Sequence, residues 1–270
     1  MLKTEMRNPK TKHIDRLDTL SQLKLMNEEN MNAVKAVDAA LEEIAAAVDK
    51  ISEAYQEGGR LFYMGAGTSG RLGVADAAEC PPTFGVDYDR VIGIIAGGDN
   101  SLRKASENAE DSEYAGIEDL KKFNFCEKDI LVGISAAGGA KYVVNAIEYA
   151  NKLGAVTVGV TSNNDSLLYK TAKFPIFTDT GAEVITGSTR LKAGTAQKLV
   201  LNMISTLLFV KCGYVYENMM VNLKPSNVKL RARVISIVRE ILNCSCEEAE
   251  EKLEASGWSI PEVLKNENGR

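Results

Sequence analysis

The sequence predicts an α/β fold, a three-layer sandwich in which a five-stranded parallel sheet lies between layers of helices. Five short apolar or β-branched runs carry this prediction, near residues 61–64, 91–96, 130–135, 156–161 and 174–178. The segments between these runs are long enough for the helical crossovers that parallel strands require. Alternation of this kind is typical of a sheet covered on both faces. We therefore expect an α/β domain over residues 57–215.

Helices are expected before this domain. Across residues 17–55 apolar positions recur three or four residues apart, and Gly58 and Gly59 then end the pattern. This periodicity predicts an N-terminal helical arm over residues 1–56.

Two further helical regions follow the last expected strand. Residues 189–212 form a long apolar run, but polar residues such as Lys192 interrupt it, so a core or subunit-interface helix is expected rather than a membrane span. After Pro225 the composition becomes basic and then acidic, with the charges on solvated helix faces. A small C-terminal helical tail is predicted over residues 216–270.

Composition excludes several classes of function. The formal charge of −5 gives no basic field for nucleic acid or an anionic membrane. No charged start followed by an apolar run opens the chain, which indicates the cytoplasm. The five scattered cysteines are expected to be reduced thiols. With His13 as its single histidine, the chain has no multi-histidine metal site, and we expect neither a metal nor a cofactor.

Two of the expected strands run directly into glycine-rich turns that open helices. Residues 61–64 lead into the loop 65–71, and residues 130–135 lead into the loop 136–141. In open parallel sheets, ligands gather at the carboxyl ends of strands, where loop amides and a helix N-terminus point at a phosphate. Each loop therefore resembles an anion-binding turn.

The first loop fits a sugar phosphate better than a dinucleotide. Residues 65–70 match G-x-G-x-x-G, but the acidic residue expected about 20 positions on is missing, since Asp99 lies 29 residues beyond Gly70. Pro81 and Pro82 are also expected to cut the following helix short. The hydroxyls of Thr68 and Ser69 suit a phosphate monoester, although Ser and Thr also cap helices routinely.

Carboxylates are the candidates for proton transfer. Glu79 lies next to the expected proline stop, and residues 107–111 hold three more acids; spacing alone favours exposed, solvated positions for all of them. A helix from Ser69 to Glu79 would span about 15 Å, beyond the reach of one hexose phosphate. Either that helix ends early and the chain folds back, or Glu79 serves a site whose phosphate loop belongs to another subunit.

Three long strings resemble one family. GAGTSGRLGVADAAECPPTFG (65–85), AGGDNSLRKASENAEDS (96–112) and GAEVITGSTRLKAGTAQKLVLNM (181–203) are similar to the N-acetylmuramic acid 6-phosphate etherases, which contain the sugar isomerase domain. The resemblance runs from about Arg7 to Glu251. It implies a sugar isomerase type of fold, cleavage of the lactyl ether of N-acetylmuramate 6-phosphate to N-acetylglucosamine 6-phosphate and D-lactate in cell-wall recycling, no metal, and a homodimer.

The resemblance also implies roles for particular residues. Glu79 matches the glutamate that donates a proton to the departing lactate, and Glu110 matches the second active-site glutamate; which acts as acid and which as base stays open. The remaining residues expected around the sugar phosphate are Gly67, Thr68, Ser69, Gly70, Arg71, Ser135, Gly138, Gly139, Glu183, Ser188 and Lys192.

The chain departs from the family pattern in two places. Where the family reads Ala-Ser-Gly-Arg-Thr-Pro, residues 136–141 read Ala-Ala-Gly-Gly-Ala-Lys, so two hydroxyls and an arginine are replaced. Each lost charge-assisted contact to a phosphate costs about 1.5–3 kcal/mol, which Ser135 and Lys141 are candidates to offset. The C-terminal helical region is expected to be shorter than in the family.

Two other functions fit the same domain. A non-catalytic sugar-phosphate sensor, as in glucokinase regulatory proteins, would agree with the altered second loop. A sugar-phosphate isomerase would use Glu79 or Glu110 to move a proton between C1 and C2. Release of D-lactate distinguishes the etherase from both.

Overall fold

The computed structural model describes residues 2–104, 106, 108–223, 225 and 227–268. Its central sheet has five parallel strands in the order β2-β1-β3-β4-β5. The strands are β1 (Leu61–Gly65), β2 (Val91–Ile95), β3 (Ile130–Ile134), β4 (Val156–Thr161) and β5 (Phe174–Phe177). Gly65 pairs with Ile95 on one side and Ile134 on the other, so β1, β2 and β3 end together. The predicted parallel sheet is confirmed.

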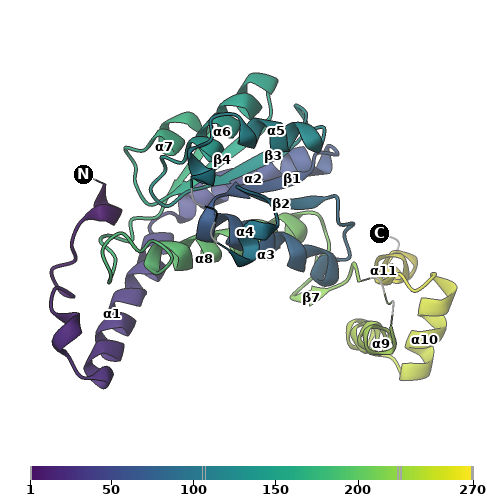
Figure 1. Cartoon of the computed structure of the whole chain (residues 1–270). Helices are drawn as coiled ribbons and strands as arrows, with labels where there is room; N and C mark the ends of the chain where they lie inside the picture. Colours follow the sequence, from purple (N-terminus) through teal and green to yellow (C-terminus); the bar gives the residue numbers. More distant parts are fainter. Residues whose placement is uncertain (1, 105, 107, 224, 226, 269–270) are drawn as a thin grey trace. The chain divides into compact units, whose positions relative to one another are not determined.

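Helices cover both faces of this sheet (Figure 1). One layer contains α5 (Ala115–Lys122), α6 (Lys141–Leu153) and α7 (Leu167–Thr171), and the other contains α2 (Leu41–Gln56), α3 (Gly67–Phe84) and α8 (Lys192–Lys211). Every residue of β1 and β3 is buried, which explains why these strands read as continuous apolar runs. The three-layer sandwich is therefore also confirmed.

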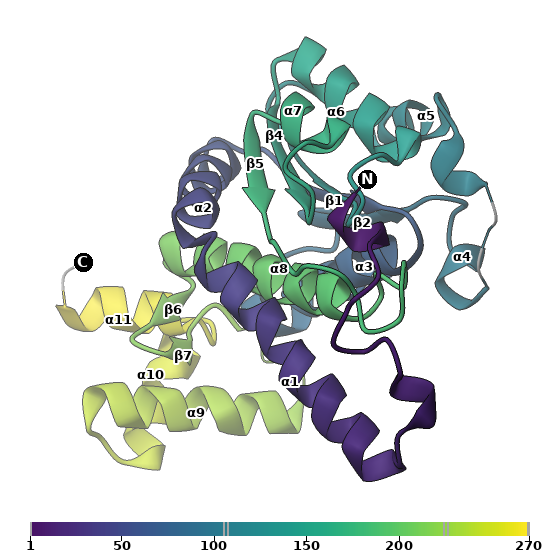
Figure 2. The same ribbon diagram turned by 90° about the vertical axis from the view of Figure 1, so that its left-hand side faces the viewer.

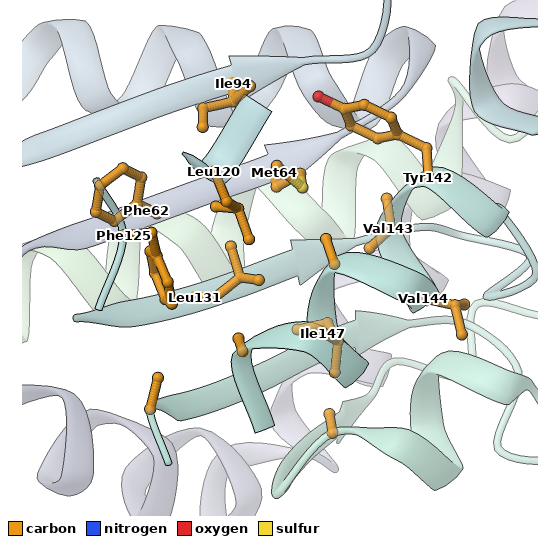
Figure 3. Packing of buried hydrophobic residues seen from close by; sticks show 14 of the residues in the cluster. Phe62, Met64, Ile94, Leu120, Phe125, Leu131, Tyr142, Val143, Val144 and Ile147 are labelled. Carbon is orange, nitrogen blue, oxygen red and sulfur yellow. The ribbon is translucent and has the colours of Figure 1, made fainter. Parts of the chain in front are cut away.

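The core beneath α6 fixes the ends of β1 and β3 (Figure 3). Phe62 and Met64 of β1, Leu131 of β3, and Tyr142 and Ile147 of α6 belong to one buried core, and none of the five is more than 1% exposed. Fully buried side chains of this size contribute about 1.5–3 kcal/mol each. This packing holds the carboxyl edge of the sheet in a fixed position.

The N-terminal helical pattern divides into two helices, since α1 (Thr19–Asp38) ends two residues before α2 begins. Asp18 caps α1 by accepting a hydrogen bond from the Ser21 amide. Two short 3₁₀ helices precede it, η1 (Lys3–Glu5) and η2 (Ile14–Arg16).

The chain divides into two compact units. The first contains the sheet, its N-terminal helices and α8 as far as Leu208, whereas the second contains Glu79–Tyr88 and the chain from Phe209 onward. In the second unit lie β6 (Val215–Tyr216), β7 (Met219–Met220), α9 (Val228–Leu242), α10 (Cys246–Ala255) and α11 (Ile260–Asn268). The sequence did not indicate the β6–β7 hairpin. The three domains expected with boundaries after residues 56 and 215 stay a prediction.

Helix α3 runs on through both prolines, and the expectation that they cut it short is wrong. It ends at Phe84, with Pro81 and Pro82 inside its last turn. Proline has a helix-compatible φ, but it lacks an amide donor and crowds the carbonyl four residues back. These two prolines therefore disturb only the last turn, because only Thr83 and Phe84 follow them in the helix. Gly85, with φ of +68°, ends the helix instead.

Helix α8 is long and apolar enough to span a membrane by length and hydropathy alone. However, 56% of its apolar window is buried inside the protein. More than half of this apolar stretch is thus covered by the rest of the protein, as expected of a core helix.

Candidate active site

The turn after β1 brings the helix start of α3 to the carboxyl edge of the sheet. The helix begins at Gly67, whose φ of +54° is left-handed and favours glycine. A Cβ on Gly70 would lie 2.5 Å from the Gly65 carbonyl oxygen, so only glycine permits this close approach of strand and helix. Thr68 and Ser69 therefore lie in the first turn, where backbone amides lack helical partners, and Arg71 begins the next turn. The turn joins the end of β1 to the start of α3, and anion binding there stays a prediction.

Two cavities border this turn. The smaller, of about 280 Å³, is lined by Glu5, Ala66, Gly67, Thr68, Ser69, Glu110, Ile134, Ser135, Ala136, Ala137, Ala140, Gly187 and Thr189. The larger, of about 390 Å³, is lined by Ala66, Gly67, Arg71, Ala96, Ser101, Ser106, Asn108, Ala109, Glu110 and Asp111. Of the described residues, Ala66, Gly67 and Glu110 border both. The smaller cavity joins the two glycine-rich turns to one of the two expected glutamates.

Ser69 contacts a residue that sequence reasoning missed. Its hydroxyl donates to Gln197 Oε1 on α8 over 3.0 Å, while the buried Nε2 of Gln197 has no partner among the described residues. If the amide turns over, Nε2 donates to Ser69 and the serine proton becomes free for a ligand. A bound anion that accepts this proton would give Ser69 and Gln197 Nε2 each a partner, while Gln197 Oε1 would take the position without one.

The Arg71 guanidinium uses two of its nitrogen atoms in hydrogen bonds to the protein backbone. Its Nε and Nη2 donate to the carbonyl oxygens of Leu102 (3.0 Å) and Ser101 (2.6 Å) at the short helix α4 (Asn100–Arg103). The guanidinium thus fixes one wall of the larger cavity and does not line the smaller one.

The second turn contributes Ser135 to the smaller cavity. Ser135 Oγ accepts the Gly138 amide over 3.1 Å, which leaves its own proton for a ligand. Lys141, a candidate to replace the missing arginine, instead pairs with Glu113 over 2.8 Å, and this pairing raises the pKa of Lys141. Lys141 lines neither cavity. Gly139 is exposed and has open space around it.

Substituting alanine for Gly138 is expected to disrupt this turn. Gly138 has φ of +72°, and a Cβ there would lie 2.2 Å from Ser166 Oγ. Strain and overpacking together predict a loss of about 1–3 kcal/mol in the free energy of unfolding, with weaker phosphate binding. Urea unfolding and phosphate titration measure both, and Gly139→Ala is the control because no atom lies within 4 Å of its added Cβ. Equal behaviour of the two variants would contradict this account.

The expected binding residues that do not line the smaller cavity are Gly70, Arg71, Gly138, Gly139, Glu183, Ser188 and Lys192. Glu183 is fully buried, and its carboxylate accepts the amides of Lys192 and Ala193, so it caps α8. Ser188 lies between Gly187 and Thr189 of the smaller cavity without lining it. The structure therefore brings Gly67, Thr68, Ser69, Ser135 and Glu110 together, and does not bring Glu183, Ser188 or Lys192 into the same cavity.

Lys192 forms a buried ion pair. Its Nζ lies 2.6 Å from Glu29 Oε2, with side chains only 2% and 3% exposed, and also donates to the Ala182 carbonyl. Asn8 donates to the same carboxylate oxygen over 2.7 Å. Burial by itself would raise the pKa of Glu29, but the hydrogen bonds from Lys192 and Asn8 outweigh it and hold that pKa below its ordinary value.

The two expected glutamates occupy different surroundings. Glu110 lies in the 3₁₀ helix η3 (Ala109–Asp111), is exposed, and borders both cavities. Glu79 is also exposed, but it lies ten residues beyond Ser69 on the unbroken helix α3. An early end of that helix is thus excluded. Glu107 lies outside the described residues, and among those described no three His, Cys, Asp or Glu side chains are grouped to hold a metal ion.

This chain matches one protein-family model and several individual curated proteins. Residues 43–151 match the family model described as the glucokinase regulatory protein N-terminal SIS domain. A curated N-acetylmuramic acid 6-phosphate etherase from Clostridium botulinum (strain Okra) is 53% identical, with 96% of this chain and 86% of the relative covered. The etherase from Halalkalibacterium halodurans is 51% identical, with 96% of this chain and 87% of the relative covered. The etherase from Actinobacillus pleuropneumoniae serotype 5b is 52% identical, with 93% of this chain and 82% of the relative covered.

Solved structures share the fold. The phosphoheptose isomerase from Neisseria gonorrhoeae is 15% identical with a TM-score of 0.53, covering 71% of this chain and 98% of its own. The protein c3406 from E. coli CFT073 is 16% identical with a TM-score of 0.54, covering 74% and 95%. At these identities the likeness concerns the sheet and its helical layers.

Proposed function

The chain belongs to the N-acetylmuramic acid 6-phosphate etherase family, and from this premise we propose that the smaller cavity binds the sugar phosphate. This proposal rests on one observation: a single cavity at the carboxyl ends of β1 and β3 is lined by Thr68, Ser69, Ser135 and Glu110. The amides of the first turn of α3 and the three hydroxyls supply donors for the phosphate. Glu110 supplies a carboxylate within the same space.

The reaction is cleavage of the D-lactyl ether of N-acetylmuramic acid 6-phosphate to N-acetylglucosamine 6-phosphate and D-lactate. Curated relatives that are more than half identical over nearly the whole chain carry this assignment. A non-catalytic sensor or an isomerase is not favoured, because the relatives reported above at more than half identity are all etherases.

The chemistry requires a base and an acid. In the open-chain sugar, the base removes the C2 proton, the C2–C3 double bond forms, and the C3–O bond breaks as lactate leaves with a proton from the acid. Water then adds its oxygen to C3, and a proton returns to C2. Two carboxylates in different surroundings suit these opposite tasks.

In our proposal Glu110 is one of these two groups, because it borders the phosphate turn. Glu79 is the other, and the structure bears on how it reaches a substrate. Ten residues of unbroken helix from Ser69 correspond to about 15 Å along α3. We therefore place Glu79 in the site of a second subunit, so that a homodimer holds two shared sites.

Mixed dimers test the shared site. Neither Glu79→Gln nor a Thr68→Ala/Ser69→Ala double variant is expected to release lactate efficiently alone. When the two variants are refolded together, one site of each heterodimer combines wild-type Glu79 with a wild-type turn. Random pairing makes half of the dimers heterodimers, so up to about a quarter of wild-type activity is expected. Mixing two batches of the Glu79 variant is the control, and no recovery in confirmed heterodimers would refute the shared site.

We also place the enzyme in the cytoplasm, where its five free cysteines stay reduced. A coupled assay for D-lactate tests the activity itself. Purified protein is expected to release one D-lactate and one N-acetylglucosamine 6-phosphate per substrate. Tight binding of the sugar phosphate without lactate would overturn the etherase and support a sensor.

A further inference from the structure

The N-terminal segment lies across the carboxyl edge of the sheet. Lys3 donates its amide to Asn163 Oδ1 over 3.0 Å, just beyond β4. Asn163 in turn donates to Thr4 Oγ1 (3.3 Å) and to the Ala136 carbonyl (2.9 Å), in the turn after β3. Thr4 is fully buried by these contacts. The segment is thus tied to the second phosphate turn.

The same segment is also tied after Glu5. Asn8 donates to the Ala182 carbonyl over 3.2 Å, and Thr11 Oγ1 donates to the Val184 carbonyl over 2.8 Å. Figure 2 shows this segment, in dark purple, beside the loop that precedes α8. Chain ends are poorly ordered unless they are tied down. Here anchors on both sides fix the position of Glu5.

The Glu5 carboxylate lines the smaller cavity together with Thr68, Ser69 and Glu110. Across the cavity wall, a Cβ on Gly187 would lie 3.1 Å from Glu5 Oε2, which leaves room for glycine but little for a larger residue. In the described part of the chain, no donor is recorded for this carboxylate. Glu5 is exposed to solvent, and an ionised carboxylate only accepts hydrogen bonds, so a ligand that binds it must offer a donor.

A sugar phosphate offers donors at one end only. Its phosphate oxygens are acceptors and repel a carboxylate, whereas its hydroxyls and acetamido N–H are donors. The amides and hydroxyls of the two turns suit the phosphate. The carboxylate of Glu5 therefore suits the sugar and not the phosphate.

We propose that Glu5 is a sugar-binding residue, which accepts hydrogen bonds from hydroxyl or acetamido groups of the substrate. This inference rests on the proposed function of the smaller cavity. A single charge-assisted hydrogen bond lost from both ground and transition states corresponds to roughly a 10- to 100-fold loss of kcat/KM, mostly as a higher KM.

Glu5→Gln is expected to weaken substrate binding without weakening phosphate binding. The variant is expected to raise KM for N-acetylmuramate 6-phosphate, but to leave inhibition by inorganic phosphate equal or tighter, since a negative charge is removed from an anion site. A merely structural role would weaken both together. Glu28→Gln is the matched control, because Glu28 is 66% exposed and pairs with Lys10 of the same segment outside the cavity.

A failure of the Glu5 proposal can be distinguished from a failure of the proposed function. An unchanged KM in Glu5→Gln, or parallel weakening of substrate and phosphate, would overturn the inference while wild-type lactate release upholds the function. If wild-type protein releases no lactate, the activity fails, and Glu5 is then tested by calorimetry with N-acetylglucosamine 6-phosphate. Weaker sugar-phosphate binding with unchanged phosphate binding supports the inference there, and equal binding of both by variant and wild type overturns it.

Discussion

Replacing Glu110 with glutamine is expected to lower kcat for D-lactate release by about two to four orders of magnitude. Glutamine keeps the shape of the side chain but neither accepts nor gives the proton that the elimination requires. Glu110 is exposed and borders both cavities at the phosphate turn, so the substitution is not expected to disturb the fold. A stopped coupled assay at saturating substrate measures the effect.

The neighbouring acid provides the control. Asp111 lines only the larger cavity, so Asp111→Asn is expected to change kcat far less. A Glu110→Gln enzyme with wild-type kcat would refute the proposed role of Glu110. A loss of activity in Asp111→Asn as large as in Glu110→Gln would contradict the choice of the smaller cavity.

Replacing Lys192 with methionine is expected to lower the free energy of unfolding by about 3–5 kcal/mol. The substitution removes the buried cation that lies 2.6 Å from the Glu29 carboxylate and leaves only the exposed amine of Lys10, 3.6 Å from Oε1, to balance a side chain that is 3% exposed. Because the folded-state pKa of Glu29 lies below the ordinary value of 4.5, the pair stabilises the protein above that pH. This stabilisation is lost as the pH falls through the lower, folded-state pKa. Urea unfolding at neutral and acidic pH measures both effects.

A second substitution separates stability from binding. Removing both charges in Glu29→Leu/Lys192→Met is expected to restore most of the stability, since a buried pair replaced by apolar residues is often neutral. If Lys192 is structural, lactate release returns with stability. A stable double variant without activity would instead support the direct phosphate contact that the family resemblance implies.

The strands and the phosphate turn could be predicted because their signals are local. Buried runs such as residues 61–64 and the glycines at 65 and 70 follow from the tight packing between a strand and the next helix. These features depend on neighbours only a few residues apart, so the pattern carries them directly.

The rest of the site depends on contacts between distant segments. Glu5 meets Gly187, and Gln197 meets Ser69, across separations that no periodicity reports. The partner of the Lys192 side chain could not be predicted either, because the position of Lys192 at the start of α8 does not reveal that Glu29 of α1 lies beside its amine. The continuation of α3 through Pro81 and Pro82 was missed because contacts of its last turn, such as Phe84 stacked on Phe209, come from residues distant in the sequence.

Turnover in water labelled with oxygen-18 tests the central claim most directly. Elimination followed by water addition breaks the bond between C3 of the sugar and the ether oxygen. The account therefore predicts one labelled oxygen at C3 of N-acetylglucosamine 6-phosphate and unlabelled D-lactate, both measured by mass spectrometry. Label in the lactate, or binding of the sugar phosphate with no lactate at all, would contradict it.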